Sequence, residues 1–239
     1  MSALPHRLVV IPVFNEERHV AEILCELAKW HTDEVLVVND GSTDRTAEIL
    51  GQRCCKSLNV ITHGTNKGYG AALIAGFRFA IEGGFAEVVT MDADWQHQPC
   101  AVPRFFEELK NSDIVSGSRY LEEFGGNDAA PSSRREINKQ ITARINSISG
   151  FNLTDGFCGF KALRVEALKR LHLDEPGYAF PLQFWIQASA AKLSIKELAV
   201  KRIYNDPSRS FGESLDNPDV RLAHYNAVID KESKRWLAK

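Results

Sequence analysis

The sequence predicts an α/β protein with a Rossmann-like, mostly parallel sheet and helices on both of its faces. Short apolar, β-branched segments alternate with longer amphipathic ones through the first half of the chain, a pattern typical of βαβ units. Several of the apolar segments end in Asn, Asp, Ser or Gly, as strands do where a sheet edge binds ligands. With 239 residues and no evident linker, we expect one domain over 1–239, with halves at about 1–119 and 120–239.

The first half is predicted to contain five strands and four helices. The strands are expected at Leu8–Val13, Glu34–Val38, Asn59–His63, Val88–Met91 and Ile114–Ser118. The helices are expected at Glu16–Lys29, Asp44–Gln52, Ala71–Ile81 and Val102–Lys110. Asn15 is a candidate cap for the first helix, and Ser42 or Thr43 for the second, because their side-chain oxygens can accept from the first turn.

The pattern changes after Tyr120. A loop that we expect to be mobile covers Leu121–Ser133, and a basic helix follows it. The segment Gly156–Lys161 is predicted to return to the sheet as a strand or a turn. The remaining predictions are helices at Val165–Leu171, Phe180–Ala191 and Val220–Trp236, a strand at Ser194–Val200, and a loop at Asn205–Pro218.

Composition excludes several classes of protein. A net charge of -2 gives no general reason to expect nucleic acid binding. The longest apolar runs are far shorter than the roughly 20 residues that span a bilayer, and no secretory signal follows Met1. The five cysteines are odd in number and lack paired metal spacing, so we expect reduced thiols in a cytoplasmic protein.

Two carboxylates follow the fourth predicted strand directly. Asp92 and Asp94 are spaced i, i+2, so in an extended segment their side chains point the same way. Such a pair repels unless a cation or a shared proton lies between its members. Oxygen ligands suit a hard divalent ion that also holds a phosphate. The alternative is a solvated Asp-x-Asp turn, but the position after a buried strand favours a metal site.

The ends of the other strands carry further polar residues. Helix caps explain Asn15 and Ser42, but a cap does not explain Asp40, which precedes Gly41. Its carboxylate could accept from a base N–H or a ribose hydroxyl. Phe14 either faces a base or packs in the core.

Several motifs occur in a fixed order along the chain. They are Ile11–Glu17, Val38–Asp44, Asn66–Gly70, Met91–Asp94 and Gly117–Tyr120. This succession resembles family 2 glycosyltransferases. Asp94–Pro99, Asp155–Phe160 and Gly177–Phe180 make it similar to the branch that transfers mannose or glucose to dolichyl or polyprenyl phosphate. An ordered set of motifs is far more specific than any one of them.

The resemblance implies an A-type nucleotide-sugar fold in which the first half binds the donor and the second half the acceptor. It implies an inverting enzyme that moves a hexose from a GDP-mannose or UDP-glucose type of donor to a polyprenyl or dolichyl phosphate. Asp92, Asp94 and Gln96 would hold Mg²⁺ or Mn²⁺. The expected nucleotide-sugar contacts are Pro12, Phe14, Glu16, Asp40, Asp92, Ala93, Asp94, Arg119, Arg202 and Arg209.

The acceptor decides which catalytic groups are needed. Arg119 would stabilise charge on the leaving diphosphate, together with the divalent ion that Asp92 and Asp94 would hold. A phosphate acceptor is already a nucleophile at pH 7, whereas a sugar hydroxyl needs a carboxylate base. Asp155 is the best candidate for that base, and a turn cap is its alternative role. Arg134, Arg135 and Lys139 fit an acceptor phosphate, or else form a solvated helix face.

Three other functions compete with transfer to a lipid phosphate. A family 2 transferase could act on a saccharide hydroxyl instead. A nucleotidyltransferase would need a Gly-rich loop after the first strand, which Pro12–Glu17 lacks. A non-catalytic sugar-nucleotide binder would have a broken metal site, yet Asp92, Asp94 and Gln96 are all present. The chain lacks the C-terminal apolar spans of some relatives, so we expect contact with the membrane only at its cytoplasmic surface.

Overall fold

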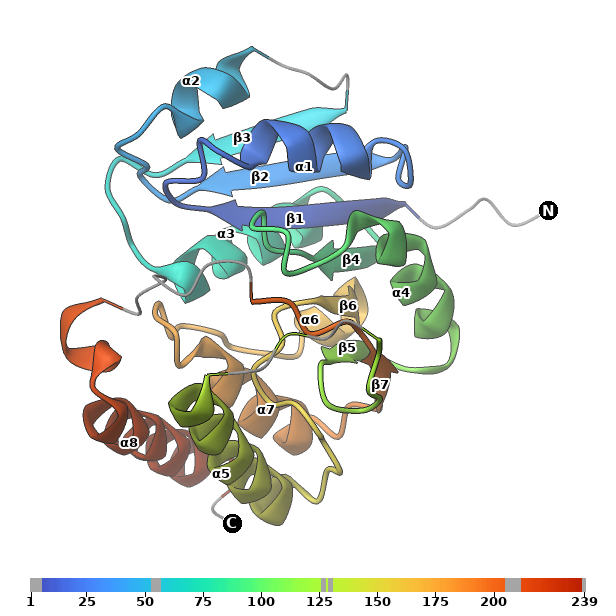
Figure 1. Ribbon diagram of the computed structural model, residues 1–239. Helices are drawn as coiled ribbons and strands as arrows, with labels where there is room; N and C mark the ends of the chain where they lie inside the picture. The colour runs from blue at the N-terminus through green and yellow to red at the C-terminus, as the bar shows by residue number, and fades with distance from the viewer. Residues whose placement is uncertain (1–5, 53–56, 126–127, 129–130, 205–211, 238–239) are drawn as a thin grey trace.

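A computed structural model describes residues 6–52, 57–125, 128, 131–204 and 212–237. Its centre is one seven-stranded sheet with the strand order β3-β2-β1-β4-β6-β5-β7 (Figure 1). The strands are β1 (Arg7–Val13), β2 (Glu34–Asn39), β3 (Leu58–Thr62), β4 (Glu87–Thr90), β5 (Ile114–Ser118), β6 (Lys161–Arg164) and β7 (Ile195–Ala199).

All neighbouring strands are parallel except at β6. This strand lies between β4 and β5 and runs antiparallel to both, with Val89 opposite Ala162 and Val115 opposite the same residue. The mostly parallel sheet is therefore confirmed, and the return of the Gly156–Lys161 region to the sheet takes the form of an inserted antiparallel strand. Strands from both predicted halves belong to the same sheet, so their carboxyl ends can form one site.

Helices cover both faces of the sheet. They are α1 (Val20–Leu27), α2 (Thr46–Gly51), α3 (Tyr69–Glu82), α4 (Val102–Glu108), α5 (Ser132–Ser149), α6 (Val165–Leu168), α7 (Phe180–Ala190) and α8 (Pro218–Trp236). Short 3₁₀ turns occur at Pro99–Ala101, Leu109–Asn111 and Glu213–Asp216. None of the helices in the described part of the chain is long and apolar enough to cross a membrane.

Alternating residues of the strands supply two hydrophobic cores. Leu8 and Val10 face the larger core, which packs against α3, α5, α7 and α8. Val9 and Ile11 face the smaller core, which packs against α1, α2 and α4. This alternation follows from the two-residue repeat of a strand, and both faces are apolar because helices cover both. Figure 1 shows α5, α7 and α8 grouped below the sheet.

Helices α1 and α2 begin later than predicted, and α3 and α8 each begin two residues earlier. Helix α1 begins at Val20 rather than Glu16, and α2 begins at Thr46 rather than Asp44. Neither has a side-chain cap. Asn15 has a φ of 56°, a left-handed conformation that Asn tolerates better than most residues. Asn15 and Ser42, which were predicted as caps, instead form hydrogen bonds between the loops after β1 and β2.

Candidate functional site

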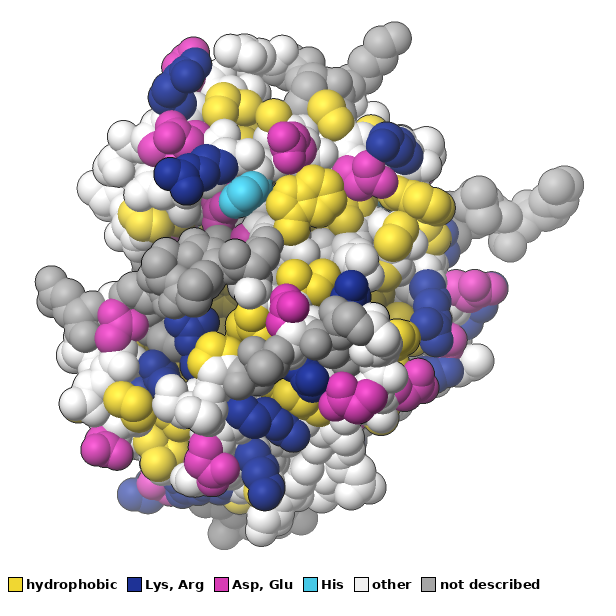
Figure 2. All heavy atoms as spheres, in the orientation of Figure 1, with side chains coloured by type: hydrophobic (Ala, Val, Ile, Leu, Met, Phe, Trp, Pro, Cys, Tyr) yellow, Lys and Arg dark blue, Asp and Glu magenta, His cyan; other side chains and the backbone are white. Residues whose placement is uncertain are grey.

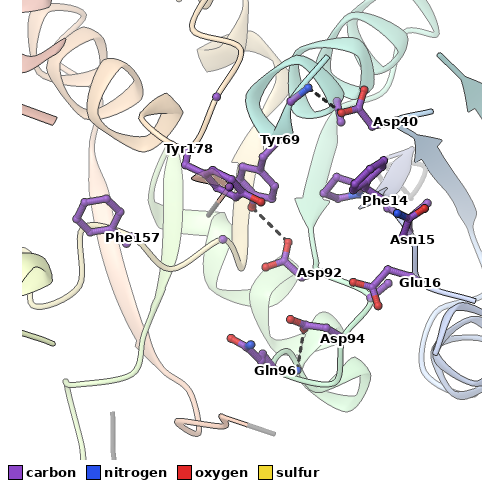
Figure 3. Close-up of a pocket in the computed structure, with 18 of the residues that line it drawn as sticks. Phe14, Asn15, Glu16, Asp40, Tyr69, Asp92, Asp94, Gln96, Phe157 and Tyr178 are labelled. Carbon is purple, nitrogen blue, oxygen red and sulfur yellow. Dashed lines mark hydrogen bonds between the residues drawn. The ribbon is translucent and has the colours of Figure 1, made fainter. Parts of the chain in front are cut away.

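A cavity of about 960 Å³ opens at the carboxyl ends of β1, β2, β4 and β5. This is the edge at which ligands bind in open α/β sheets. Most of the sequence-predicted donor and metal residues line it, namely Pro12, Phe14, Glu16, Asp40, Asp92, Ala93, Asp94, Gln96 and Arg119. Figure 3 shows Glu16, Asp92, Asp94 and Gln96 gathered on one side of this cavity, with Phe157 on the other.

The two carboxylates after β4 are held by their neighbours. Asp94 is almost fully buried, and its Oδ1 accepts the backbone N–H of Gln96 at 3.0 Å. Trp95, which lies between Asp94 and Gln96, has a φ of 65°. This conformation turns the chain sharply after the strand. Asp92 accepts the hydroxyl of Tyr69 at Oδ1, at 3.2 Å. Both carboxylates line the cavity, as the i, i+2 spacing predicted.

The histidine of this loop is structural. The backbone N–H of Asp92 donates to Nδ1 of His97 at 2.9 Å, so Nδ1 must carry no proton. Burial lowers the pKa of His97 to about 4, which agrees with a neutral ring at pH 7. The ring also stacks on Phe160, with centroids 4.9 Å apart. His97 therefore fixes the backbone at Asp92 rather than titrating near neutral pH.

The loops after β1 and β2 are joined to each other by short polar side chains. Asn15 accepts the backbone N–H of Thr43 at 2.8 Å, and Ser42 accepts the N–H of Asn15 at 3.0 Å. Thr46 accepts the N–H of Glu16 at 2.9 Å. These contacts explain why the polar residues of both motifs occur together. They position Phe14, which is 43% exposed and lines the cavity, where a base could stack.

Asp40 organises the loop before α3. Its carboxylate accepts the backbone N–H groups of Lys67 and Gly68, the latter at 2.7 Å, and lies 2.6 Å from Nδ1 of His63. Gly68 has a φ of 104° and no room for a Cβ, which would lie 2.4 Å from the carbonyl oxygen of Pro176. Asp40 thus lines the cavity while holding the Asn66–Gly70 motif in place.

Asp155 lies in a different place from that expected of a base. It is fully buried and forms a two-pronged ion pair with Arg119, with Oδ2 2.6 Å from Nε and Oδ1 2.9 Å from Nη2. Asn138 donates to the same Oδ1 at 2.8 Å. The Arg119 guanidinium and these donors hold the pKa of Asp155 well below its usual range despite burial. The role as a base is therefore wrong, and Asp155 instead fixes Arg119 against the cavity.

The predicted basic cluster is divided among three environments. Arg134 lines the cavity. Arg135 instead places its guanidinium over the ring of Tyr120, 3.6 Å from the centroid, and Lys139 is exposed outside the cavity. Residues three or four apart share a helix face, whereas Arg134 is one residue from Arg135 and five from Lys139. Of the three residues predicted to contact an acceptor phosphate, Arg134 is thus the one that lines this cavity, and the solvated helix face fits Lys139.

Of the two arginines predicted near the end of the chain, Arg202 is among the described residues and does not line the cavity. Arg202 pairs with Glu123 at 3.2 Å and donates through Nε to the carbonyl oxygen of Asp128 at 2.6 Å. It also lies over Tyr120, 5.5 Å from the ring centroid. It thereby joins the segment after β5 to the segment after β7. Arg209 lies outside the described residues.

Sequence reasoning missed the aromatic lining and one arginine. All five tyrosines of the chain line the cavity, at positions 69, 120, 178, 204 and 225. Arg221 of α8 also lines it and is 3% exposed. Burial lowers the pKa of Arg221, and the charge of Arg134 adds to this effect, so the two guanidiniums are close enough to interact. The available signal was that Tyr69, Tyr120 and Tyr178 belong to the ordered motifs Asn66–Gly70, Gly117–Tyr120 and Gly177–Phe180.

The oxygen donors near β4 fit a divalent ion that binds together with a phosphate. Among the described residues, no group of three or more His, Cys, Asp or Glu side chains is arranged to hold a metal alone. Mg²⁺ typically uses one or two carboxylates and completes its shell with water and substrate phosphates. Asp92, Asp94 and the amide oxygen of Gln96 match that donor set.

The sheet, the edge cavity and the paired carboxylates define an A-type glycosyltransferase fold. The chain belongs to glycosyl transferase family 2, whose family model matches residues 8–172. The family that the ordered motifs predicted is therefore confirmed, and the chain is a glycosyltransferase.

Relatives with assigned activities support the predicted branch. The chain is 33% identical over 214 residues to an undecaprenyl-phosphate mannosyltransferase of Micrococcus luteus, covering 87% of this chain and 86% of that protein. It is 29% identical over 227 residues to a UDP-N-acetylglucosamine–dolichyl-phosphate N-acetylglucosaminyltransferase of Methanococcus voltae, covering 87% and 89%. A dolichol-phosphate mannosyltransferase of Pyrococcus furiosus is 33% identical over 193 residues, covering 77% of this chain and 53% of that protein.

Solved structures confirm the fold. Glucosyl-3-phosphoglycerate synthase of Mycobacterium tuberculosis, in complex with Mn²⁺, UDP and glucosyl-3-phosphoglycerate, is similar with a TM-score of 0.70 and 20% identity. The match covers 95% of this chain and 80% of that one. The same enzyme with Mg²⁺ and UDP also has a TM-score of 0.70.

Proposed function

We propose that the protein transfers a hexose from a nucleoside diphosphate sugar to a polyprenyl phosphate, with inversion at the anomeric carbon. The observation that carries this proposal is the composition of the two ends of one cavity. Carboxylates lie at the β4 end, while Arg134 and Arg221 come from α5 and α8 at the other. The named activities of the curated relatives point to the same class of acceptor.

The donor would bind between the strand ends and the loop before α3. Phe14 would stack on the base, and the loop that Asp40 holds would close over the nucleotide. Asp92, Asp94 and Gln96 would hold Mg²⁺ or Mn²⁺ against the diphosphate. Such an ion neutralises charge that builds on the leaving oxygen. Either GDP or UDP fits this description, since both present the same diphosphate.

The acceptor phosphate would bind at the cationic end. Arg134 and Arg221 lie close to each other and to Tyr225, whose pKa burial raises to about 12. The tyrosine therefore remains a hydrogen-bond donor at neutral pH. Like charges gathered in a partly closed cavity favour an anionic ligand, and guanidinium groups bind phosphate oxygens well.

The reaction would then be a single displacement. An oxygen of the acceptor phosphate attacks the anomeric carbon as the bond to the nucleoside diphosphate breaks, and the leaving oxygen keeps the bonding electron pair. Arg119 is held rigidly by Asp155 and lines the cavity, so it is preorganised to stabilise the developing charge. No general base is needed, because the acceptor is already ionised at pH 7.

Cations and aromatic side chains mark the face on which the acceptor would approach. Figure 2 shows basic side chains gathered over the lower part of the molecule, where α5 and α8 lie. Tyr178 and Val220 are exposed near the cavity residues Gly177 and Arg221. An anionic membrane surface attracts such a face, so we place the contact with lipid there, with the chain at the cytoplasmic side.

The direct test is a transfer assay with labelled GDP-mannose, UDP-glucose and UDP-N-acetylglucosamine. Each is incubated with Mn²⁺ or Mg²⁺ in the presence and absence of a polyprenyl phosphate. We expect label in an organic-extractable product only when the lipid phosphate is present. Label on a soluble saccharide without any lipid product would overturn the acceptor assignment and favour a saccharide-specific family 2 enzyme. Nucleotide binding without any transfer would favour a non-catalytic binder.

A further inference from the structure

Tyr69 occupies the position where the two ends of the cavity meet. It is the first residue of α3 and follows Gly68, and its side chain lies in the cavity wall (Figure 3). Its hydroxyl donates to Oδ1 of Asp92 at 3.2 Å.

A glycine packs against both the Tyr69 hydroxyl and this carboxylate. A Cβ at Gly159 would lie 2.5 Å from the Tyr69 hydroxyl and 3.1 Å from Oδ2 of Asp92. Real Cβ atoms do not approach this closely, so a side chain here would push one group or the other out of place. His97 adds a third constraint, because its Nδ1 accepts the backbone N–H of Asp92 at 2.9 Å. Tyr69, Gly159 and His97 together define one orientation of Asp92.

The ring of Tyr69 reaches the acceptor side. It stacks on Tyr178, with centroids 6.1 Å apart and planes 14° apart. The backbone supports this contact, since the N–H of Ala71 donates to the carbonyl oxygen of Pro176 at 3.0 Å. A Cβ at Gly70 would lie 2.2 Å from the carbonyl oxygen of Glu175, so the two segments pack closely only because this position is a glycine.

We propose that Tyr69 is a positioning residue: its hydroxyl orients the metal-binding carboxylate Asp92, and its ring holds Tyr178 at the acceptor side. The inference rests on the proposed metal-assisted transfer. The hydroxyl and the ring of Tyr69 thus have separate functions, and two substitutions distinguish them experimentally. Tyr69→Phe removes the hydroxyl and keeps the stacked ring, whereas Tyr69→Leu removes both.

The first test measures nucleotide binding without acceptor. Isothermal titration calorimetry with GDP and with UDP, each with and without Mn²⁺, is applied to the parent and to Tyr69→Phe. We expect affinity in the presence of Mn²⁺ to fall about tenfold, as for the loss of one hydrogen bond to a charged group, and metal-free affinity to remain unchanged. Trp30→Phe is the matched control, because it removes a hydrogen bond of 3.0 Å to the Glu26 carboxylate at a site outside the cavity; its Mn²⁺ dependence should equal that of the parent.

The second test separates the ring from the hydroxyl. Tyr69→Leu should lose the same Mn²⁺-dependent affinity as Tyr69→Phe and should also raise the KM for the polyprenyl phosphate severalfold. In an Asp92→Asn background, Tyr69→Phe should cause no further loss of affinity, because the hydroxyl acts through that carboxylate. Gly159→Ala, whose Cβ would crowd both the Tyr69 hydroxyl and Asp92, should reproduce the effect of Tyr69→Phe and replaces that variant if Tyr69→Phe is unstable.

Equal Mn²⁺-dependent affinity in the parent, Tyr69→Phe and Gly159→Ala would overturn the inference. Asp94→Asn distinguishes this failure from failure of the proposed function. If Asp94→Asn loses Mn²⁺-dependent binding while the Tyr69 and Gly159 variants keep it, only the positioning role is wrong. If Asp94→Asn also binds normally, the metal site itself is wrong.

Discussion

The donor end and the acceptor end of the cavity are built by different means. At the donor end, short polar side chains bind backbone groups of neighbouring loops, as Asn15 does with Thr43 and Asp40 with Gly68. At the acceptor end, long side chains from separate helices meet, such as Arg134 of α5 and Arg221 of α8. The first kind of site is fixed by local loop geometry, and the second by how helices pack.

This difference predicts different consequences of mutation. A donor-end carboxylate lies at the rim of the sheet, so its loss should affect chemistry more than stability. A buried pair such as Arg119 and Asp155 joins the two ends, so its loss should affect both. A cation at the acceptor end should affect only the acceptor.

The largest effect is expected at the metal site. Asp94→Asn should reduce transfer by about a hundredfold or more, because metal charge stabilisation is worth several kcal/mol, while the melting temperature changes little. Steady-state transfer and thermal unfolding measure the two quantities. Asp33→Asn, at an exposed loop position, is the matched control. Near-normal transfer in Asp94→Asn, or parental activity that resists EDTA, would show that transfer does not depend on a metal ion at Asp94.

The buried ion pair should reveal itself in stability as well as in rate. Asp155→Asn leaves Arg119 without its charged partner, which typically costs about 3–5 kcal/mol. Pairing lowers the folded-state pKa of Asp155. The contribution of this ion pair to the free energy of unfolding is therefore fully present above the unfolded-state pKa near 3.9. It is lost as the pH falls below that value. Urea unfolding of parent and variant at pH 7 and at about pH 3 should show a difference that shrinks in acid. A constant difference at both pH values would contradict the ion-pair explanation.

Loss of the donor-loop carboxylate should weaken nucleotide binding moderately. Asp40→Ala removes the acceptor for the N–H groups of Lys67 and Gly68, so the loop before α3 should loosen. We expect nucleotide affinity to fall by about 1–3 kcal/mol, measured by calorimetry with GDP and UDP. The KM for the acceptor should not change. An unchanged dissociation constant for both nucleotides would exclude Asp40 from the donor end.

The smallest effect should come from a group outside both ends. His31 is buried beside Phe106 and donates through Nε2 to the carbonyl oxygen of Glu34, 3.2 Å away. Burial lowers the pKa of His31, so the unfolded chain takes up its proton first as pH falls. Stability should therefore decline below about pH 6.5, and His31→Gln should make this decline shallower without changing transfer at pH 7. An identical pH profile of the melting temperature in both proteins would refute this role.

The sequence predicted the sheet and the donor end well, and the reason is physical. Periodic apolar strands and their polar ends are local features, so Asp92 and Asp94 could be predicted from spacing, whereas the role of Gln96 was implied only by the family resemblance. Where the prediction was wrong, a longer-range contact decided the structure. Asn15 binds Thr43 across two loops instead of capping a helix, and Asp155 binds Arg119 from 36 residues away. Arg221 could not be assigned because only the packing of α8 against α5 brings it to the cavity.

Arg134→Gln tests most directly whether the two ends have separate functions in transfer to a lipid phosphate. The measurement combines the KM for a polyprenyl phosphate with the dissociation constant for the nucleotide that the parent binds more tightly. Arg135→Gln serves as the matched control, since its guanidinium lies over Tyr120 rather than in the cavity. We expect Arg134→Gln to raise the acceptor KM about tenfold, as for one charged contact, with unchanged nucleotide affinity and a smaller effect in Arg135→Gln. Weakened nucleotide binding with an unchanged acceptor KM would contradict the account.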